Sequence, residues 1–214
     1  MRKIDMNTWP RRQHFEFFRA FDHPHFSICA NLELPAFDIF VRQRSLSLNV
    51  SIVYVLARAA NAFPEFRYRI RDNQVIEHEV FHPSTTILST DNLFSFCTIQ
   101  YAEDFSVFAQ RAKEKIAHVQ QQFTLADESE ADDLLFMTSI PWLSFTSFTH
   151  PMHLQPADSV PRFAWGKTFP DGDSLKIPLS VQAHHALMDG LHVAKYFDEV
   201  QGYLHHPGTV LGNP

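Results

Sequence analysis

Cysteine and glycine are scarce in this 214-residue chain, which contains two of the former and six of the latter. Cys29 and Cys97 cannot supply the dense disulfide framework of a small secreted domain, so two free, buried thiols are expected. With so few glycines the chain has no glycine-rich loop that could cradle a phosphate. His205 and His206 are adjacent in the tail, but no third ligand lies at a zinc-like spacing, so no metal is expected.

Long apolar runs and an excess of positive charge are missing too. No stretch approaches the roughly 20 apolar residues that are needed to span a bilayer, and the N-terminal residues lack the apolar core of a signal peptide. The chain has 18 lysines and arginines against 24 aspartates and glutamates, a formal charge of −6. We therefore expect a cytoplasmic protein whose partners include neither a membrane nor a nucleic acid.

Hydrophobic material, by contrast, is plentiful. Hydrophobic residues make up 45% of the sequence, which is enough for one sizeable core. No linker rich in proline, glycine or serine divides the chain and no internal repeat appears, so residues 1–214 are predicted to form a single domain. Phenylalanine occurs 21 times, which indicates that some large apolar side chains stay exposed at a subunit interface.

Helix and strand patterns alternate irregularly along the chain. Thr8 before Trp9-Pro10 predicts a helix start, and the alternation on both sides of Asp72-Asn73 predicts a hairpin. These patterns favour an α/β fold of the two-layer α+β type, with a mixed sheet covered by helices. Predicted helices are 8–21, 35–44, 49–63, 104–123 and 191–201, and predicted strands are 26–33, 66–71, 74–77, 94–101, 134–140, 142–148, 162–168 and 175–181.

The segment 175–201 is the most informative one for function. Its apolar residues alternate as in a half-buried strand and then follow a helical rhythm from Leu191 onward. His184 and His185 therefore lie at a strand end with their side chains on opposite faces, and His185 can act as a general base near neutral pH. Asp189 lies four residues further on, where it could orient the ring, cap the helix or bind a distant cation.

Four segments, in the right order, resemble one enzyme family. His184-His185-Ala-Leu-Met-Asp189-Gly190-Leu-His192 is similar to the His-His-x-x-x-Asp-Gly-aromatic-His signature of the type A chloramphenicol acetyltransferases, with a leucine in place of the aromatic residue. Trp9-Pro-Arg11-Arg12-Gln-His14-Phe15-Glu16 resembles the family's N-terminal helix, and residues 62–67 and 141–148 match two further segments. A shorter His-x-x-x-Asp-Gly also occurs in 2-oxo-acid dehydrogenase acyltransferase cores and in peptide-synthetase condensation domains.

The resemblance implies a homotrimer that uses acetyl-CoA as its acyl donor. It makes His185 the catalytic base, which takes the proton from an acceptor hydroxyl so that this hydroxyl attacks the thioester directly. In this family Asp189 pairs with Arg11 and holds the turn that positions the histidine. The neighbouring Arg12 is expected on a solvated helix face.

Acyl transfer also needs a donor for the tetrahedral oxyanion, and one well-placed donor accelerates the reaction about 10²- to 10³-fold. At the position of the family's serine this chain has Thr138, with Ser139 next to it as the alternative. Threonine can donate the same hydrogen bond, although its methyl group restricts the rotamer. An ordinary strand threonine explains the residue equally well.

The acceptor pocket implied by the resemblance departs from the family pattern. An aromatic wall remains at Phe148, but three apolar positions become His150, Met152 and Arg162. Burying an unpaired arginine beside an aromatic antibiotic would be costly, so this side chain either turns outward or marks a different, anionic acceptor. The expected acceptor-binding residues are Phe18, His25, Phe148, His150, Met152, Arg162 and Ala164.

Three functional hypotheses follow. The first is acetyl-CoA-dependent O-acetylation of chloramphenicol or a related amphenicol, which is an antibiotic-resistance activity. The second retains the chemistry but assigns another small alcohol or amine as the acceptor. The third is a non-catalytic trimeric binding protein, against which the intact His185, Asp189 and Arg11 argue.

Overall fold

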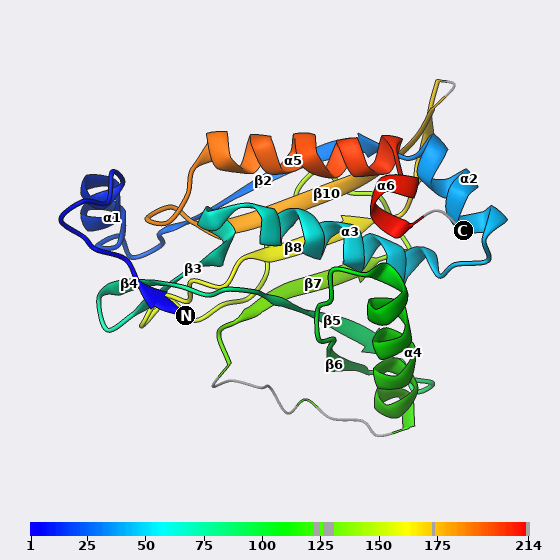
Figure 1. The fold of residues 1–214 in the computed structure, drawn as a ribbon, viewed down its shortest axis with the longest axis horizontal. Helices are drawn as coiled ribbons and strands as arrows, with labels where there is room; N and C mark the ends of the chain where they lie inside the picture. Colours follow the sequence, from blue (N-terminus) through cyan, green and yellow to red (C-terminus); the bar gives the residue numbers. More distant parts are fainter. Residues whose placement is uncertain (122–124, 126–130, 173, 213–214) are drawn as a thin grey trace.

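A mixed β-sheet covered by helices forms the body of the protein (Figure 1). The computed structural model describes residues 1–121, 125, 131–172 and 174–212. The strands are β1 (Arg2–Lys3), β2 (His25–Glu33), β3 (Tyr68–Arg71), β4 (Gln74–Glu77), β5 (His82–Leu88), β6 (Phe94–Thr98), β7 (Leu134–Ile140), β8 (Arg162–Gly166), β9 (Phe169–Asp171) and β10 (Ser174–His184). The helices are α1 (Arg12–Phe18), α2 (Pro35–Gln43), α3 (Leu48–Ala62), α4 (Phe105–Gln121), α5 (Gly190–His205) and α6 (Gly208–Leu211), with a 3₁₀ turn at Pro64–Arg67.

The main sheet has seven strands in the order β2-β10-β8-β7-β5-β6, with β9 paired to β10, and a smaller sheet has the order β1-β4-β3. β7 runs parallel to both β5 and β8, whereas β10 is antiparallel to β2 and β8. This mixed sheet with its helices confirms the predicted mixed α/β fold. Along β10 the side chains alternate, so that Val181 and Ala183 enter the main core while Gln182 and His184 point to the other face.

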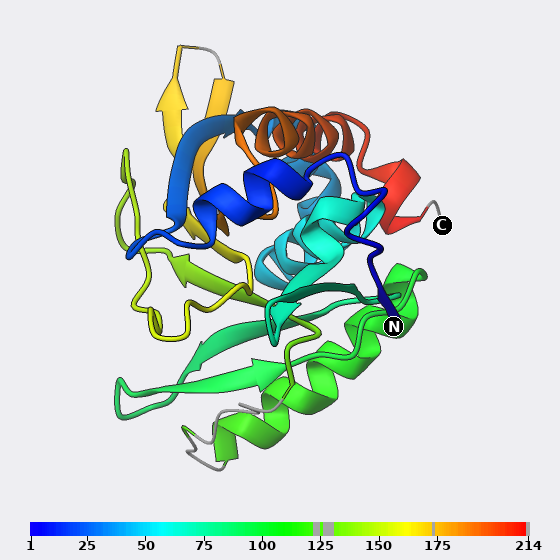
Figure 2. The same cartoon turned by 90° about the vertical axis from the view of Figure 1, so that its left-hand side faces the viewer.

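Helices α3, α4 and α5 cover one face of the main sheet (Figures 1 and 2). The sequence predicted that α3 is packed on both sides, and the structure confirms this, since nine of its 15 residues are buried. Ser47 caps its first turn by accepting a hydrogen bond from the N–H of Val50 at 3.4 Å. Tyr196 of α5 donates its hydroxyl to the Leu56 carbonyl at 3.2 Å, which ties the two helices together.

The opposite face is crossed by the irregular segment 141–161 (Figure 2). The predicted strand at 142–148 is wrong, because this segment forms no ladder with a neighbouring strand and is attached to the sheet largely through side chains that project from it. The Phe148 carbonyl accepts hydrogen bonds from the hydroxyls of Ser27 on β2, at 3.0 Å, and Ser180 on β10, at 3.1 Å. The segment therefore lies over the sheet as a second layer.

This layer approaches the sheet closely at Gly166. A Cβ atom added there would lie 2.9 Å from the Leu143 carbonyl oxygen and 2.8 Å from Pro178 Cγ, both of which are forbidden contacts. The same carbonyl accepts a hydrogen bond from the N–H of Lys167 at 2.9 Å. A side chain at position 166 would therefore push the 141–161 segment off the sheet.

The first helix is shorter than predicted. The range 8–21 shrinks to α1, which has no side-chain cap at its start. Thr8 does not cap the helix, because its hydroxyl donates to the Asp5 carbonyl at 3.3 Å and to the Asp5 carboxylate at 3.2 Å. Thr8 thus stabilises a turn that precedes the helix.

Other predicted elements hold with small differences. Asp72 and Asn73 adopt φ values of 47° and 61°, as a two-residue hairpin turn of type I′ requires. The predicted strand 94–101 ends earlier, at Thr98, and β5 has no counterpart among the predicted strands. The end of the helix predicted for 104–123 lies outside the described residues.

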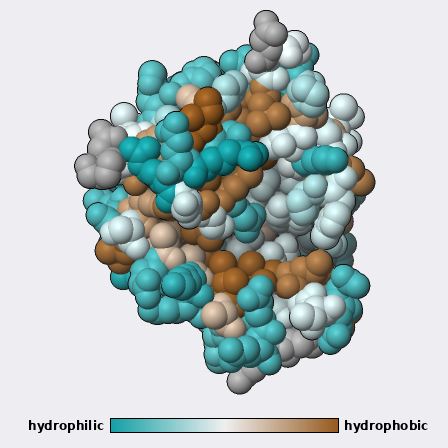
Figure 3. Space-filling model, turned by 90° about the vertical axis from the view of Figure 1, so that its right-hand side faces the viewer, coloured by the Kyte–Doolittle hydropathy of each residue, from teal (hydrophilic) through white to brown (hydrophobic). Residues whose placement is uncertain are grey.

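Several large apolar side chains remain on the surface. Trp142 is 65% exposed, Leu143 is 55% exposed and Phe17 on α1 is 61% exposed. Figure 3 shows one side of the molecule, on which hydrophobic residues lie between hydrophilic patches. None of the helices in the described ranges is long and apolar enough to cross a bilayer.

A buried cation joins the smaller sheet to the main one. Arg69 on β3 is fully buried, with its guanidinium 4.0 Å from the centroid of the Phe81 ring. Burial lowers the pKa of Arg69 to about 9, so the side chain keeps its charge at neutral pH. The guanidinium donates hydrogen bonds to the backbone carbonyls of Asp132 (2.7 Å), Phe66 (3.0 Å), Tyr68 (2.7 Å) and Leu134 (2.6 Å).

We expect Arg69→Met to lower the free energy of unfolding by about 3 kcal/mol, because it leaves several buried carbonyls without a donor. Chemical denaturation measures this change. Arg42→Met on α2 is the matched control, since the Arg42 side chain is 77% exposed and its ion pair with Asp38 stabilises the protein by less than about 1 kcal/mol. Equal effects of the two substitutions would contradict the structural role given to Arg69.

Candidate active site

The turn between β10 and α5 holds the two adjacent histidines in fixed positions. His185 donates its backbone N–H to the Pro24 carbonyl at 2.8 Å, which extends the pairing of β10 with the segment before β2. His184 Nδ1 accepts a hydrogen bond from the N–H of Ala186 at 3.2 Å. The backbone on both sides of the His185 side chain is therefore tied to neighbouring atoms.

Asp189 serves as the cap of α5, one of the three roles that the sequence left open. Its Oδ1 accepts a hydrogen bond from the N–H of Leu191 at 3.1 Å and lies 2.9 Å from His192 Nδ1. His192 Nε2 in turn lies 3.6 Å from a carboxylate oxygen of Glu65. These contacts fix the start of α5 directly after the histidine pair.

Arg11 clamps the same turn from the N-terminal segment. Its guanidinium bonds to Asp189 Oδ2 at 2.6 Å, to the His185 carbonyl at 2.9 Å and to the Ala186 carbonyl at 3.3 Å. Burial alone would raise the pKa of Asp189, but the hydrogen bond from Arg11 and the nearby charges outweigh it and lower this pKa to about 2. Arg12 points elsewhere and pairs with Glu16 at 2.8 Å on the exposed side of α1.

The ring of His185 lies between two phenylalanines. It stacks on Phe18 with the ring centroids 3.9 Å apart and an interplanar angle of 4°, and the Phe26 ring centroid is 4.8 Å away. Nδ1 of His185 is buried and makes no hydrogen bond within the described part of the chain. This packing holds the imidazole by its faces and leaves Nε2 as the nitrogen that can meet a substrate.

His184 lies on the other face of the sheet and is buried. Its ring centroid is 5.0 Å from that of His25, its cross-strand partner on β2. Burial, together with the neighbouring His25, lowers the pKa of His184 to about 3, so the ring is neutral. His184 thus contributes to packing and to the turn.

The two oxyanion candidates, Thr138 and Ser139, lie on β7, which is separated from β10 by β8. Both residues are half-buried, and Thr138 pairs across the strands with Ala164. Ala164 is buried and in turn pairs with Ser180 of β10. Within the described residues, no hydrogen bond joins Thr138 to His185.

Most of the expected acceptor-binding residues gather on the face that carries the 141–161 layer. His150 packs the edge of its ring against Phe148, with the centroids 4.8 Å apart, and donates its backbone N–H to Gln182 Oε1 at 2.8 Å. Gln182 Nε2 reaches Met152 Sδ at 3.9 Å. Phe18 lies apart from this group, beneath the ring of His185.

Arg162 does not turn outward. Its side chain is 7% exposed, forms an ion pair with Asp158 and donates to the Val160 carbonyl at 2.9 Å. The carbonyl of Asp158 lies 2.6 Å from His25 Nε2, so His25 joins the same polar group. Burial lowers the pKa of His25, which keeps its ring neutral. The charge of Arg162 is therefore neutralised within the chain.

The candidate residues form two groups on opposite faces of the main sheet. His185 rests on Phe26, whose side chain packs against the core under the helices. Gln182 and its neighbours lie on the face crossed by the 141–161 layer.

Sequence reasoning missed two residues of these groups. Phe26 lies in a predicted strand, but only the pairing of β2 with β10 brings it against His185. Asp158 lies in a stretch predicted to be irregular, and its spacing from Arg162 carried no helical signal that could have linked the two. Both gaps concern contacts that the chain makes only when folded.

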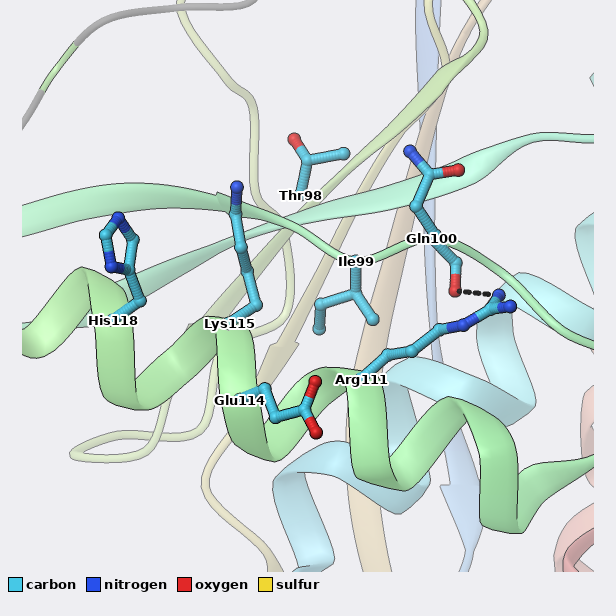
Figure 4. A pocket seen from close by; sticks show the side chains of 7 residues that line it. All are labelled: Thr98, Ile99, Gln100, Arg111, Glu114, Lys115 and His118. Carbon is cyan, nitrogen blue, oxygen red and sulfur yellow. Dashed lines mark hydrogen bonds between the residues drawn. The ribbon is translucent and has the colours of Figure 1, made fainter.

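One surface cavity lies away from both groups, between β6 and α4 (Figure 4). It has a volume of about 580 Å³, and Arg111 within it donates to the Gln100 carbonyl at 3.2 Å. None of the predicted site residues lines it. The remaining residues that line the cavity are Thr98, Ile99, Glu114, Lys115 and His118.

Within the described ranges, the structure contains no cluster of three or more histidine, cysteine or acidic residues that could hold a metal ion.

Comparisons with known proteins agree with the motifs. A chloramphenicol acetyltransferase from Klebsiella sp. is 29% identical over 94% of this chain and 92% of the relative. Chloramphenicol acetyltransferase 2 from Escherichia coli is 30% identical over 93% of this chain and 94% of its own length. A solved structure of a chloramphenicol acetyltransferase superposes with a TM-score of 0.90 at 28% identity, covering 95% of this chain and 100% of that one.

The family model described as chloramphenicol acetyltransferase matches residues 1–201, which is nearly the whole chain. Together with the relatives, this match confirms the resemblance carried by the histidine signature. The chain belongs to the chloramphenicol acetyltransferase family.

Proposed function

We propose that this protein is an acetyl-CoA-dependent O-acetyltransferase that inactivates chloramphenicol or a related amphenicol and so confers antibiotic resistance. The observation that carries this proposal is the clamped turn, in which Arg11 bonds to the His185 carbonyl and to Asp189 while the imidazole stacks on Phe18. A histidine that only filled the core would not need its backbone fixed by a guanidinium. The family to which the chain belongs supports the same activity.

The chemistry assigned to His185 is general base catalysis. Nε2 takes the proton from the acceptor hydroxyl as its oxygen attacks the thioester carbonyl of acetyl-CoA, forming a tetrahedral oxyanion. Collapse of this intermediate forms the acetyl ester and breaks the carbon–sulfur bond, and the thiolate of CoA receives the proton from the imidazolium. Such a base accelerates a reaction about 10²- to 10⁴-fold.

The oxyanion requires a donor, and we assign this role to Thr138, with Ser139 as the alternative. Both lie on β7 in the middle of the main sheet, where the backbone is fixed by pairing with Ala164 and Trp165 of β8. Neither hydroxyl is occupied by another residue of the described chain. A donor held on a strand in this way needs no reorganisation when the charge develops.

We further propose that residues 1–214 fold as a single domain and that three such chains assemble. In the trimer, His185 of one subunit would face the acceptor-binding group of its neighbour. The placement of these two groups on opposite faces of the sheet supports this arrangement. The exposed Trp142, Leu143 and Phe17 offer apolar surface for such contacts.

A second candidate function is the same acyl transfer to another small alcohol or amine. The specific observation in its favour is the polar group formed by His150, Gln182, Arg162 and Asp158, which replaces an apolar lining. Because Arg162 is already paired with Asp158, this group does not favour an anionic acceptor.

We expect His185→Ala to lower the turnover number about 10²- to 10⁴-fold, because no other base is in place to accept the hydroxyl proton. Release of free thiol from acetyl-CoA, followed spectrophotometrically with and without chloramphenicol, measures this. His206→Ala, which changes an exposed tail histidine, is the control and should keep full activity.

The same assay separates the three functional hypotheses. Thiol release with chloramphenicol supports the first, and release only with other alcohols or amines supports the second. Binding without release by the wild-type protein would support a non-catalytic binder. Undiminished turnover by His185→Ala would rule out the proposed mechanism.

We expect Arg11→Met and Asp189→Asn each to destabilise the protein by about 3 kcal/mol, because each leaves a partly buried charge without its ionic partner. Since both act on the same turn, the double variant should lose less than the sum of the single losses. Unfolding free energies and turnover numbers of the three variants measure this coupling.

Arg12→Met is the matched control, because its exposed pair with Glu16 should stabilise the protein by about 0.5 kcal/mol or less. Strict additivity of the two single losses would show that the ion pair does not act as a unit.

The folded-state pKa of Asp189 is about 2, which is below its unfolded value. The contribution of Asp189 to the free energy of unfolding is therefore present above about pH 4 and is lost as the pH falls toward 2.

A further inference from the structure

The ring of His192, on the first turn of α5, has a carboxylate near each of its two nitrogens. Nδ1 lies 2.9 Å from Asp189 Oδ1, and Nε2 lies 3.6 Å from Glu65 Oε1. The His192 side chain is only 21% exposed, so these contacts are partly shielded from solvent. Acidic and basic side chains therefore alternate along one chain of contacts, which runs through Glu65, His192, Asp189 and Arg11.

His192 meets both the backbone and the side chain of Asp189. Its Nδ1 accepts a hydrogen bond from the Asp189 N–H at 3.1 Å, which gives it the place of the glutamate or glutamine in a capping box. A proton on Nδ1 would be donated to Asp189 Oδ1, 2.9 Å away. In either form, the ring of His192 restricts the movement of the carboxylate to which Arg11 binds.

Glu65 is held at a fixed distance from α5 by the packing of its neighbour. It lies on the 3₁₀ turn after α3, where Phe66 is fully buried and its ring centroid is 4.7 Å from that of Tyr196 on α5. Within the described residues, Glu65 forms an ion pair with no side chain other than His192. The carboxylate of Glu65 is thus directed at the Nε2 side of the His192 ring.

This chain of contacts ends at the backbone of His185. Arg11 donates to the His185 carbonyl at 2.9 Å while it bonds to Asp189 Oδ2, and His192 lies at the other oxygen of the same carboxylate. Burial alone would raise the pKa of Asp189, whereas the hydrogen bond from Arg11 and then the charge of His192 lower it to about 2. His192 and Arg11 therefore stabilise one carboxylate together.

We propose that His192 and Glu65 are positioning residues for His185, the proposed catalytic base. They act on it through the pair of Asp189 and Arg11. This inference rests on the proposed acetyl transfer and adds two residues to it. A displacement of reacting groups by about 1 Å can lower a rate about 10²-fold, so loss of these contacts should lower the turnover number.

A merely structural cap would behave differently. Its removal would lower the free energy of unfolding of α5 and its surroundings but leave the turnover number of the folded protein unchanged. A positioning role predicts a lower turnover number with unchanged KM values for acetyl-CoA and the acceptor. It also predicts recovery of the turnover number when the capping contacts are restored by another side chain.

The test compares the wild-type protein with His192→Leu, His192→Gln and Glu65→Gln. Glutamine at position 192 can accept from the Asp189 N–H and donate to a carboxylate, whereas leucine can do neither. His205→Leu is the matched control, because His205 lies on the last turn of the same helix with its Nε2 3.5 Å from Glu33. Thiol release from acetyl-CoA with chloramphenicol gives the turnover number and KM, and chemical denaturation gives the stability.

A second measurement does not depend on turnover. The Phe18 ring lies parallel to the His185 ring with the centroids 3.9 Å apart, so its ring current shifts the magnetic resonance signal of the His185 Cε1 proton upfield. Spectra of protein with isotope-labelled histidine show this signal, and its loss in His185→Ala assigns it. The position of the signal reports whether the imidazole remains stacked.

We expect His192→Leu to lower the turnover number about 10- to 100-fold with unchanged KM values, and to move the His185 signal. His192→Gln should regain most of this loss. Glu65→Gln should lower the turnover number about 3-fold, because a half-buried ion pair contributes less, and this effect should vanish in the His192→Leu background.

A wild-type turnover number in His192→Leu would overturn the inference, and so would an equal loss in His205→Leu. If His192→Leu does not fold, a wild-type turnover number in Glu65→Gln would overturn it. If the wild type releases no thiol with any acceptor, but the His185 signal moves in His192→Leu and not in His205→Leu, the positioning inference stands and the proposed acetyl transfer fails.

Discussion

The ion pair between Arg11 and Asp189 is the interaction on which the candidate site depends. It joins two residues that are far apart in the sequence, and the same guanidinium bonds to the carbonyls of His185 and Ala186. Asp189 both pairs with Arg11 and caps α5, and Arg11 also holds the backbone of His185. A shift of Arg11 or Asp189 would therefore move the His185 backbone and the start of α5. The catalytic role proposed for His185 therefore depends on a residue near the opposite end of the chain.

The main sheet divides the site into two parts. His185 directly follows β10 and packs its ring against Phe18 and Phe26, whereas Gln182, three residues earlier, binds the 141–161 layer on the other face. Side chains alternate along β10, which places Gln182 and His184 on that other face. In the proposed trimer, a second copy would bring an acceptor on that face within reach of the base, so the proposed mechanism and the proposed trimer are linked.

The charged and polar residues on the sheet face under the 141–161 layer are buried as pairs. Arg162 would be too costly to bury alone, but Asp158 neutralises it and the Val160 carbonyl accepts another of its hydrogen bonds. The sequence predicted that an unpaired Arg162 would be costly to bury. It did not identify Asp158 as the partner, because Asp158 lies in a stretch without regular structure.

The sequence by itself determined the family, the mixed sheet with its helices, and the strand-to-helix segment that carries His185 and Asp189, because these depend on local periodicity and on residues close together in the chain. It misplaced a strand at 142–148 because alternating apolar residues predict a strand whether they pair in a sheet or lie over one. Only the tertiary structure decided that Phe26 packs on His185 and that Arg162 meets Asp158. Contacts between distant segments depend on strand pairing and layer packing, which no local pattern records.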